Sequence, residues 1–95
     1  MAGKAVRMRT IRQYPFNIDD VVIMRFPLGG RVVHVAMEGD SPTMWILIDT
    51  DSTTIVMREF YIVKTDSPIP NYVRTHIGTF QEETADNLFV WHVFD

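Results

Sequence analysis

The sequence predicts a small all-β domain of about seven mostly antiparallel strands, folded as a sandwich or a barrel-like domain. Apolar and polar residues alternate with a period of two along most of the chain, and no segment carries the apolar stripe of a long helix. Turn-forming residues separate the alternating segments at short intervals, as in Pro27-Leu28-Gly29-Gly30. Short segments divided by turns in this way are typical of β-sandwiches and small barrels.

Seven segments are expected to form strands because they are rich in β-branched and aromatic residues, which suit a pleated and half-buried surface. They are residues 7–14, 20–26, 31–38, 44–49, 54–64, 73–81 and 88–94. Sequences rich in Gly, Pro, Asp and Ser separate the second to sixth strands at residues 27–30, 38–42, 49–52 and 66–71. Residues 82–87 are the only helical candidate, but they lack an apolar stripe and are expected to form a loop or a single turn.

Several of these strands carry large apolar side chains on both faces. In residues 31–38, alternation sets Val33 and Val35 on one face and Val32 and His34 on the other. The same alternation sets Val56, Phe60 and Ile62 against Met57, Glu59 and Tyr61, and Phe89, Trp91 and Val93 against Leu88, Val90, His92 and Phe94. One small sheet cannot hide apolar groups on both faces, so a second sheet or a second subunit is expected to cover them. We therefore expect the chain to form homo-oligomers.

The length of 95 residues suits one domain, which we expect to span residues 1–95 with a flexible basic arm at residues 1–7. The chain has no cysteine, which excludes a disulfide scaffold, a thiolate metal site and a cysteine nucleophile. No apolar run approaches the ~20 residues that a membrane-spanning helix needs. No signal peptide is expected either, because the basic start lacks a continuous apolar region. These features predict a soluble protein of a reducing compartment.

Charge is distributed unevenly along the chain. The first 31 residues hold six basic and two acidic residues, whereas the rest hold three basic and ten acidic residues. Only the first stretch could act as a nucleic-acid arm, through Lys4, Arg7, Arg9 and Arg12, and a solvated terminus is the favoured interpretation of these residues. The formal net charge of −3 disfavours nonspecific binding to nucleic acid.

The strand that ends in Asp49-Thr50-Asp51-Ser52-Thr53 resembles the first motif of haloacid-dehalogenase-type phosphatases. That chemistry needs a parallel sheet, a downstream lysine and a further acidic pair on a metal ion. The 42 residues after Thr53 show strands without crossover helices, so a simple hairpin turn is the favoured interpretation. A calcium loop that starts at Asp49 is excluded, because Thr54 and Phe60 stand where it needs Gly and Glu.

Histidine and arginine residues supply the candidate ligand contacts. His34, His76 and His92 lack the spacing of a strand chelate, so no metal site and no cofactor are expected. Arg74 and His76 share a predicted strand face beside Tyr72, which would suit an anion, although a solvated edge strand fits the same residues. These three residues, with Arg58 as a further contact, form the expected ligand site.

The two tryptophans, Trp45 and Trp91, are interpreted as anchors of the core or of an interface. A stacking platform for a base or a sugar would require an exposed ring beside polar groups. No glycine-rich phosphate loop and no nucleophile motif occur in the chain. No catalytic residue is therefore predicted.

The second half of the chain contains two distinctive strings, Ile77-Gly78-Thr79-Phe80-Gln81 and Trp91-His92-Val93-Phe94-Asp95. They resemble a family of small proteins that tailed bacteriophages encode, and the resemblance extends over nearly the whole chain from about Arg9. Family members commonly have a Gly-rich turn where this chain has Val63-Lys64-Thr65-Asp66. The family is of unknown function, so the resemblance implies a context, the cytoplasm of an infected bacterial host, and no active site.

We therefore expect a non-enzymatic phage accessory protein that acts by binding. The favoured role is counter-defence, in which a homo-oligomer sequesters a small anionic, nucleotide-like signal of the host. The alternatives are a protein–protein inhibitor of a host nuclease, polymerase or defence complex, whose acidic later half covers a basic surface, and a minor structural component of the virion. An enzyme is the remaining alternative, because carboxylate–histidine pairs can form between distant strands.

Overall fold

The computed structural model describes residues 8–95 and confirms the all-β prediction, with seven strands and no helix in that range. The strands are β1 (Arg9–Pro15), β2 (Val21–Pro27), β3 (Arg31–Glu38), β4 (Ser41–Asp49), β5 (Ile55–Lys64), β6 (His76–Glu83) and β7 (Leu88–Phe94). Each expected segment overlaps one of them, with ends that differ by at most a few residues. The basic arm expected at residues 1–7 lies outside the described residues.

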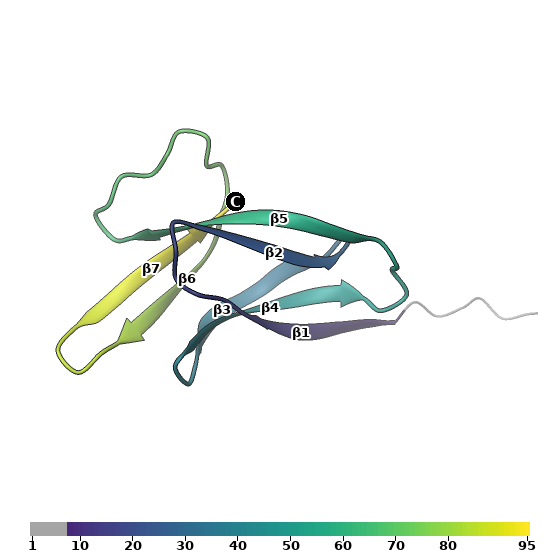
Figure 1. The fold of residues 1–95 in the computed structure, drawn as a ribbon, viewed down its shortest axis with the longest axis horizontal. Coiled ribbons are helices and arrows are strands. Elements are labelled where there is room, and N and C mark those ends of the chain that lie inside the picture. Colours follow the sequence, from purple (N-terminus) through teal and green to yellow (C-terminus); the bar gives the residue numbers. More distant parts are fainter. Residues whose placement is uncertain (1–7) are drawn as a thin grey trace, which may run out of the picture.

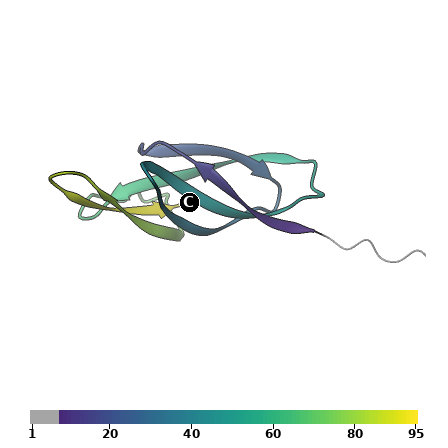
Figure 2. The same ribbon diagram turned by 90° about the horizontal axis from the view of Figure 1, so that it is seen from below.

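The strands form two antiparallel sheets that face each other as a small sandwich (Figure 1). One sheet has three strands in the order β1-β4-β3, and the other has four in the order β2-β5-β7-β6. The β6–β7 hairpin lies at one end of the molecule and the β4–β5 connection at the other (Figure 2). Every strand pair is antiparallel, so the sheet that phosphatase chemistry requires at Asp49 and Asp51 does not form in residues 8–95.

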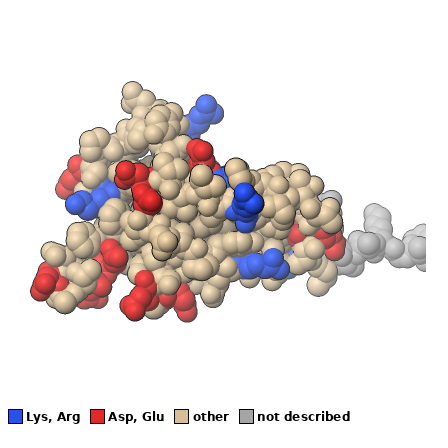
Figure 3. Space-filling model, viewed as in Figure 1, with Lys and Arg blue, Asp and Glu red and all other residues tan. Residues whose placement is uncertain are grey.

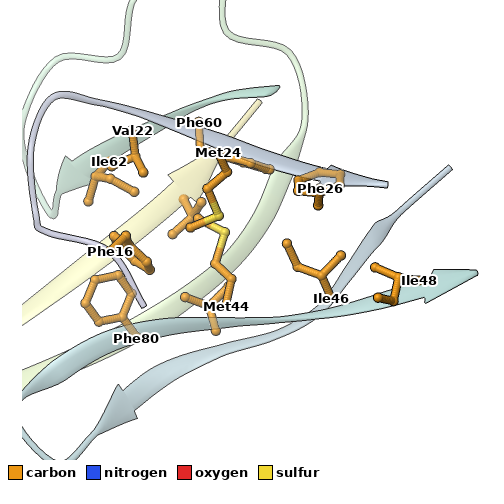
Figure 4. Close-up of a cluster of buried hydrophobic side chains, with 12 residues drawn as sticks. Phe16, Val22, Met24, Phe26, Met44, Ile46, Ile48, Phe60, Ile62 and Phe80 are labelled. Atoms are coloured by element: carbon orange, nitrogen blue, oxygen red, sulfur yellow. The ribbon is translucent and has the colours of Figure 1, made fainter. Parts of the chain in front are cut away.

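The hydrophobic core lies between the two sheets and comes from alternate residues of the strands. Met24 of β2 and Met44 of β4 point toward each other across the sandwich (Figure 4). Phe16 and Phe80 pack edge to face, with ring centroids 5.8 Å apart. The largest fully buried side chains are Phe26, Phe60, Met44, Ile46, Ile48 and Val93. Because these residues alternate with more exposed ones, each sheet presents one apolar inner face to the other.

A β-bulge in β3 makes the predicted alternation of that strand wrong. The register against β4 shifts between Val32 and His34, so one extra residue is inserted at Val33. Val32 and Val35 therefore both pack against the core, whereas Val33 and His34 are exposed. A bulge changes the face of every later residue in a strand, which a period-two pattern does not detect.

β3 and β6 lie against each other, although they belong to different sheets. Gly78 of β6 permits this approach, since a Cβ atom at its position would lie 3.0 Å from Cγ2 of Val35.

The segment 82–87 forms no helix, and Thr84 and Asn87 are hydrogen-bonded across the β6–β7 turn. No helix of the length and apolarity that a membrane crossing requires occurs in residues 8–95.

Candidate ligand site on the outer face of the four-stranded sheet

The candidate site is built on the face of the four-stranded sheet that points away from the core. Tyr61 of β5 and Phe94 of β7 stand opposite each other in the strand register. Their neighbours Ile62 and Val93 are buried in the core. Because side chains alternate along a strand, Tyr61 and Phe94 point to the outer face.

Two further rings extend this pair into an aromatic row, which we define as Tyr72, Tyr61, Phe94 and His76. Tyr72, in the β5–β6 loop, packs edge to face on Tyr61 with ring centroids 5.3 Å apart. His76, at the start of β6, packs in the same way on Phe94, also at 5.3 Å. Tyr72 is 65% exposed, so one end of the row is open to a ligand. The row brings two of the expected ligand contacts, Tyr72 and His76, to one face.

A chain of hydrogen bonds continues from His76 along the same face. His76 Nε2 lies 2.9 Å from the Thr79 hydroxyl, which in turn lies 3.1 Å from His92 Nδ1. His92 Nε2 lies 2.7 Å from the Thr65 hydroxyl, and that hydroxyl donates to the carbonyl oxygen of Val90. We call His76, Thr79, His92 and Thr65 the Thr–His chain. Imidazole and hydroxyl groups donate hydrogen bonds to anions, so this chain places polar groups beside the aromatic row.

A cavity of about 480 Å³ adjoins the Tyr72 end of the aromatic row, between the β5–β6 loop and strands β2 and β5. Tyr61 and Tyr72 form part of its wall. Polar groups come from Asp20, Lys64 and Ser67. Its remaining lining residues are Val21, Ile62, Val63, Pro68, Pro70 and Trp91. The volume lies in the range of small-molecule pockets, and the mixture of apolar walls with a few polar groups is typical of them.

The hydroxyl group of Tyr61 is fixed by a carboxylate of its own strand. It donates a hydrogen bond of 2.9 Å to Glu59 Oε2. This hydrogen bond, followed by desolvation and by the negative charges of Glu59 and Tyr72, raises the pKa of Tyr61 above its ordinary value. Tyr61 therefore holds its proton firmly and acts as a neutral ring in the row.

The two expected arginine contacts lie in different surroundings. Arg74 is exposed, its backbone N–H donates to the carbonyl oxygen of Asp95, and its side chain has no polar partner within residues 8–95. Arg58 lies two residues before the buried Phe60 in β5, so the two share the inner face of the sheet. Its Nη2 lies 2.8 Å from Asp95 Oδ2, and its guanidinium lies over the rings of Phe60 and Phe26. The structure thus separates Arg58 from Tyr72 and His76.

Sequence reasoning did not assign a role to Tyr61, Phe94, Thr79, His92 or Thr65. Alternation had set Tyr61 and His92 each on a defined face of its own strand. Only the register of β5, β7 and β6 shows that these faces are the same one. Thr79 lies three residues after His76, a spacing that sets two residues on opposite faces of a regular strand. The bulge between His76 and Gly78 brings them to the same face, and no signal of this bulge is present in the sequence.

The third histidine and the two tryptophans lie elsewhere. His34 packs on Trp45 on the outer face of the three-stranded sheet, with ring centroids 5.1 Å apart. Trp91 is partly buried against the core, and its Nε1 donates to Glu82 Oε1 at 3.2 Å. Both rings are half-buried anchors rather than fully buried core residues. No group of three metal-ligating side chains forms within residues 8–95.

The acidic pair at Asp49 and Asp51 forms a turn. The backbone N–H of Asp51 donates to Oδ1 of Asp49 at 2.9 Å, and that of Ser52 donates to the carbonyl oxygen of Asp49 at 3.2 Å. A side chain that accepts from the backbone two residues later is the hydrogen bond of an Asx-turn. A turn is therefore present as predicted, but it is not a hairpin turn, because it joins β4 of one sheet to β5 of the other.

A protein-family model described as a domain of unknown function, DUF7352, matches residues 8–95. No curated protein and no solved structure matches the chain. The matched range includes both sheets, the aromatic row and the Thr–His chain. The chain belongs to the DUF7352 family.

Proposed function

We propose that this protein is a non-enzymatic binding protein that captures a small, planar, anionic ligand of the nucleotide class. The aromatic row beside the Thr–His chain is the observation that carries the proposal. A flat ring system can stack on aromatic side chains whatever substituents it carries, while hydrogen-bond donors beside the row hold its phosphate. Both kinds of group lie on the same outer face of one sheet.

In this proposal, Tyr72 provides the stacking surface because its ring is 65% exposed. His76 and Thr79 supply hydrogen bonds to the anion from one side. Arg74 adds a charged group, since its side chain is exposed and has no polar partner within residues 8–95. The carboxylate of Glu59 accepts a hydrogen bond from the Tyr61 hydroxyl, so it serves to orient a ring of the row.

We further propose that the protein is an accessory protein of a tailed phage and that it acts in the cytoplasm of the infected bacterial host. In that setting, capture of a nucleotide-like host signal would act against a defence response. The resemblance of the two C-terminal strings supports the phage context. The absence of any predicted nucleophile motif supports capture rather than conversion.

Calorimetric titration with a panel of nucleoside monophosphates and cyclic dinucleotides tests the proposal. We expect at least one of them to bind, and we expect His76→Ala and Tyr72→Ala each to weaken that binding about tenfold or more. His34→Ala is the matched control, because His34 is also an exposed histidine on an outer sheet face but lies on the other sheet. Absence of binding to every probe, or equal binding by the His76 and His34 variants, would contradict the proposal.

A second candidate function is inhibition of a host protein that has a basic surface. Acidic side chains gather at one end of the molecule, where the β3–β4 and β6–β7 turns lie (Figure 3). They are Glu38, Asp40, Glu82, Glu83 and Asp86. Clustered negative charge accelerates association with a positive surface. A host polypeptide that co-purifies in equal amounts with the wild-type protein, but not with a Glu82→Gln/Glu83→Gln variant, would favour this function.

A further inference from the structure

β2 has a free edge along its whole length. Its partner β5 is hydrogen-bonded at the flanking pairs Asp20–Ile62 and Leu28–Thr54, and the register between these pairs has no shift. Hydrogen-bonded and non-hydrogen-bonded positions alternate in an antiparallel ladder. The backbone N–H and C=O groups of Val21, Ile23 and Arg25 therefore point away from β5, and no other described strand pairs with β2.

This edge has few of the features that commonly protect edge strands from pairing. Such features are bulges, several charged residues, prolines and coverage by another element. β3 and β6 each contain a bulge and lie against each other, and β1 carries Arg9 and Arg12. β2 is regular, and Arg25 is its only charged residue before Pro27 ends the strand.

The side chains along the same edge are also exposed and apolar. Ile23 is 58% exposed, and Val21 beside it is 41% exposed. Met57 and Ile55 of β5 continue this apolar surface away from the edge. An open edge with an apolar outer face is a template for another strand.

We propose that β2 pairs in antiparallel fashion with β2 of a second copy of this chain, which joins the two four-stranded sheets into one continuous sheet. A two-fold axis at Ile23 would place Ile23 opposite Ile23 of the second copy, and Val21 opposite Arg25. All three residues then use their free backbone groups, because the same edge serves both copies.

Charge complementarity supports this register. Asp19 lies two residues before Val21, which places it diagonal to Arg25 of the second copy. Asp19 and Arg25 are both exposed, and neither forms an ion pair within residues 8–95. The two-fold axis repeats this pairing at both ends of the joined strands. The contact is small, so we expect a dimer that dissociates on dilution.

Light scattering after size-exclusion chromatography, at a series of protein concentrations, tests the dimer. We expect the mass to rise with concentration from 11.0 kDa toward twice that value. Ile23→Lys places two like charges opposite each other on the axis and is expected to abolish the rise. Met57→Lys is the control, because Met57 is 61% exposed on the same face but lies on β5, away from the edge. Circular dichroism of each variant shows whether it has folded.

A charge exchange tests the register itself. Arg25→Glu should weaken the dimer at least tenfold, and Asp19→Arg in the same chain should restore it. Amide hydrogen exchange supplies a readout that needs no variant. The amides of Val21, Ile23 and Arg25 should become protected as the concentration rises, while that of Met24 stays protected throughout.

A mass of one chain at every concentration would overturn the proposal. So would a dimer that Met57→Lys disrupts and Ile23→Lys does not, since that pattern indicates contact through β5. The proposal does not depend on the ligand site, because a monomer could still bind the nucleotide probes and a dimer could fail to do so.

Discussion

His76 and His92 share the hydroxyl group of Thr79, which lies 2.9 Å from His76 Nε2 and 3.1 Å from His92 Nδ1. The Thr65 hydroxyl donates its hydrogen to the Val90 carbonyl, so it accepts a hydrogen bond from the His92 Nε2–H group. His92 Nδ1 then carries no proton and accepts from Thr79, which in turn accepts from His76 Nε2. When both rings are neutral, every hydrogen bond of the Thr–His chain is therefore donated in one direction, from His76 through Thr79 and His92 to Thr65.

Thr79→Val tests this direction, because it replaces the shared hydroxyl with a methyl group of similar size. We expect nitrogen NMR of the imidazole side chains to show both rings as Nε2–H tautomers in the wild-type protein at high pH. In the variant, His92 should lose this preference less than His76, because Thr65 still accepts from His92 Nε2. Binding of the nucleotide probe should weaken several-fold, since the His76 ring loses the hydrogen bond that fixes its orientation.

The control for this experiment is Thr10→Val. Thr10 is an exposed threonine on β1, in the other sheet. It should leave the imidazole signals and the binding of the probe unchanged. If the Thr79 variant keeps the wild-type tautomers and binds the probe equally well, the shared hydroxyl does not order the site.

Glu59→Gln is expected to lower the pKa of Tyr61 toward its ordinary value of 10.0. The carboxylate of Glu59 accepts a hydrogen bond from the protonated phenol and repels the phenolate, and both effects favour the protonated form. The carbon NMR signal of the Tyr61 ring during an alkaline titration measures this pKa separately from the other tyrosines. The same shift in Glu83→Gln, a change on β6, would show that general charge rather than this hydrogen bond is responsible.

The fold could be predicted from the sequence because the core residues alternate so regularly. Phe60 and Ile62 of β5 are both buried, and both were set on the face opposite Tyr61. Alternation fails at Val33, where a bulge adds one residue to β3. A bulge depends on how two strands fit together, so it leaves no period in the sequence of one strand.

The candidate site was harder to predict because it depends on strand order. Tyr72 and His76 are close in sequence and were expected to lie beside each other. Tyr61 and Phe94 join them only because β7 lies between β5 and β6. Arg58 was grouped with them on its charge alone. Its position two residues before Phe60 assigns it to the inner face.

The two expected arginine contacts should therefore respond in opposite ways to substitution by methionine. Arg58→Met removes the ion pair with Asp95 and the charge above the Phe60 ring, but keeps an apolar stem. Both members of the pair are partly exposed, with side-chain exposures of 38% and 26%. We expect a loss of about 1 kcal/mol in the free energy of unfolding and no change in binding of the nucleotide probe.

Arg74→Met should show the reverse pattern. The Arg74 side chain has no polar partner within residues 8–95, so its loss should change the free energy of unfolding by less than about 0.5 kcal/mol. Its charge lies in the loop that leads into β6 and the aromatic row, so the affinity for an anionic probe should fall several-fold. Urea unfolding and calorimetric titration of the same two variants measure both quantities. Weaker probe binding by the Arg58 variant, with normal binding by the Arg74 variant, would move the ligand site to the inner face of the sheet.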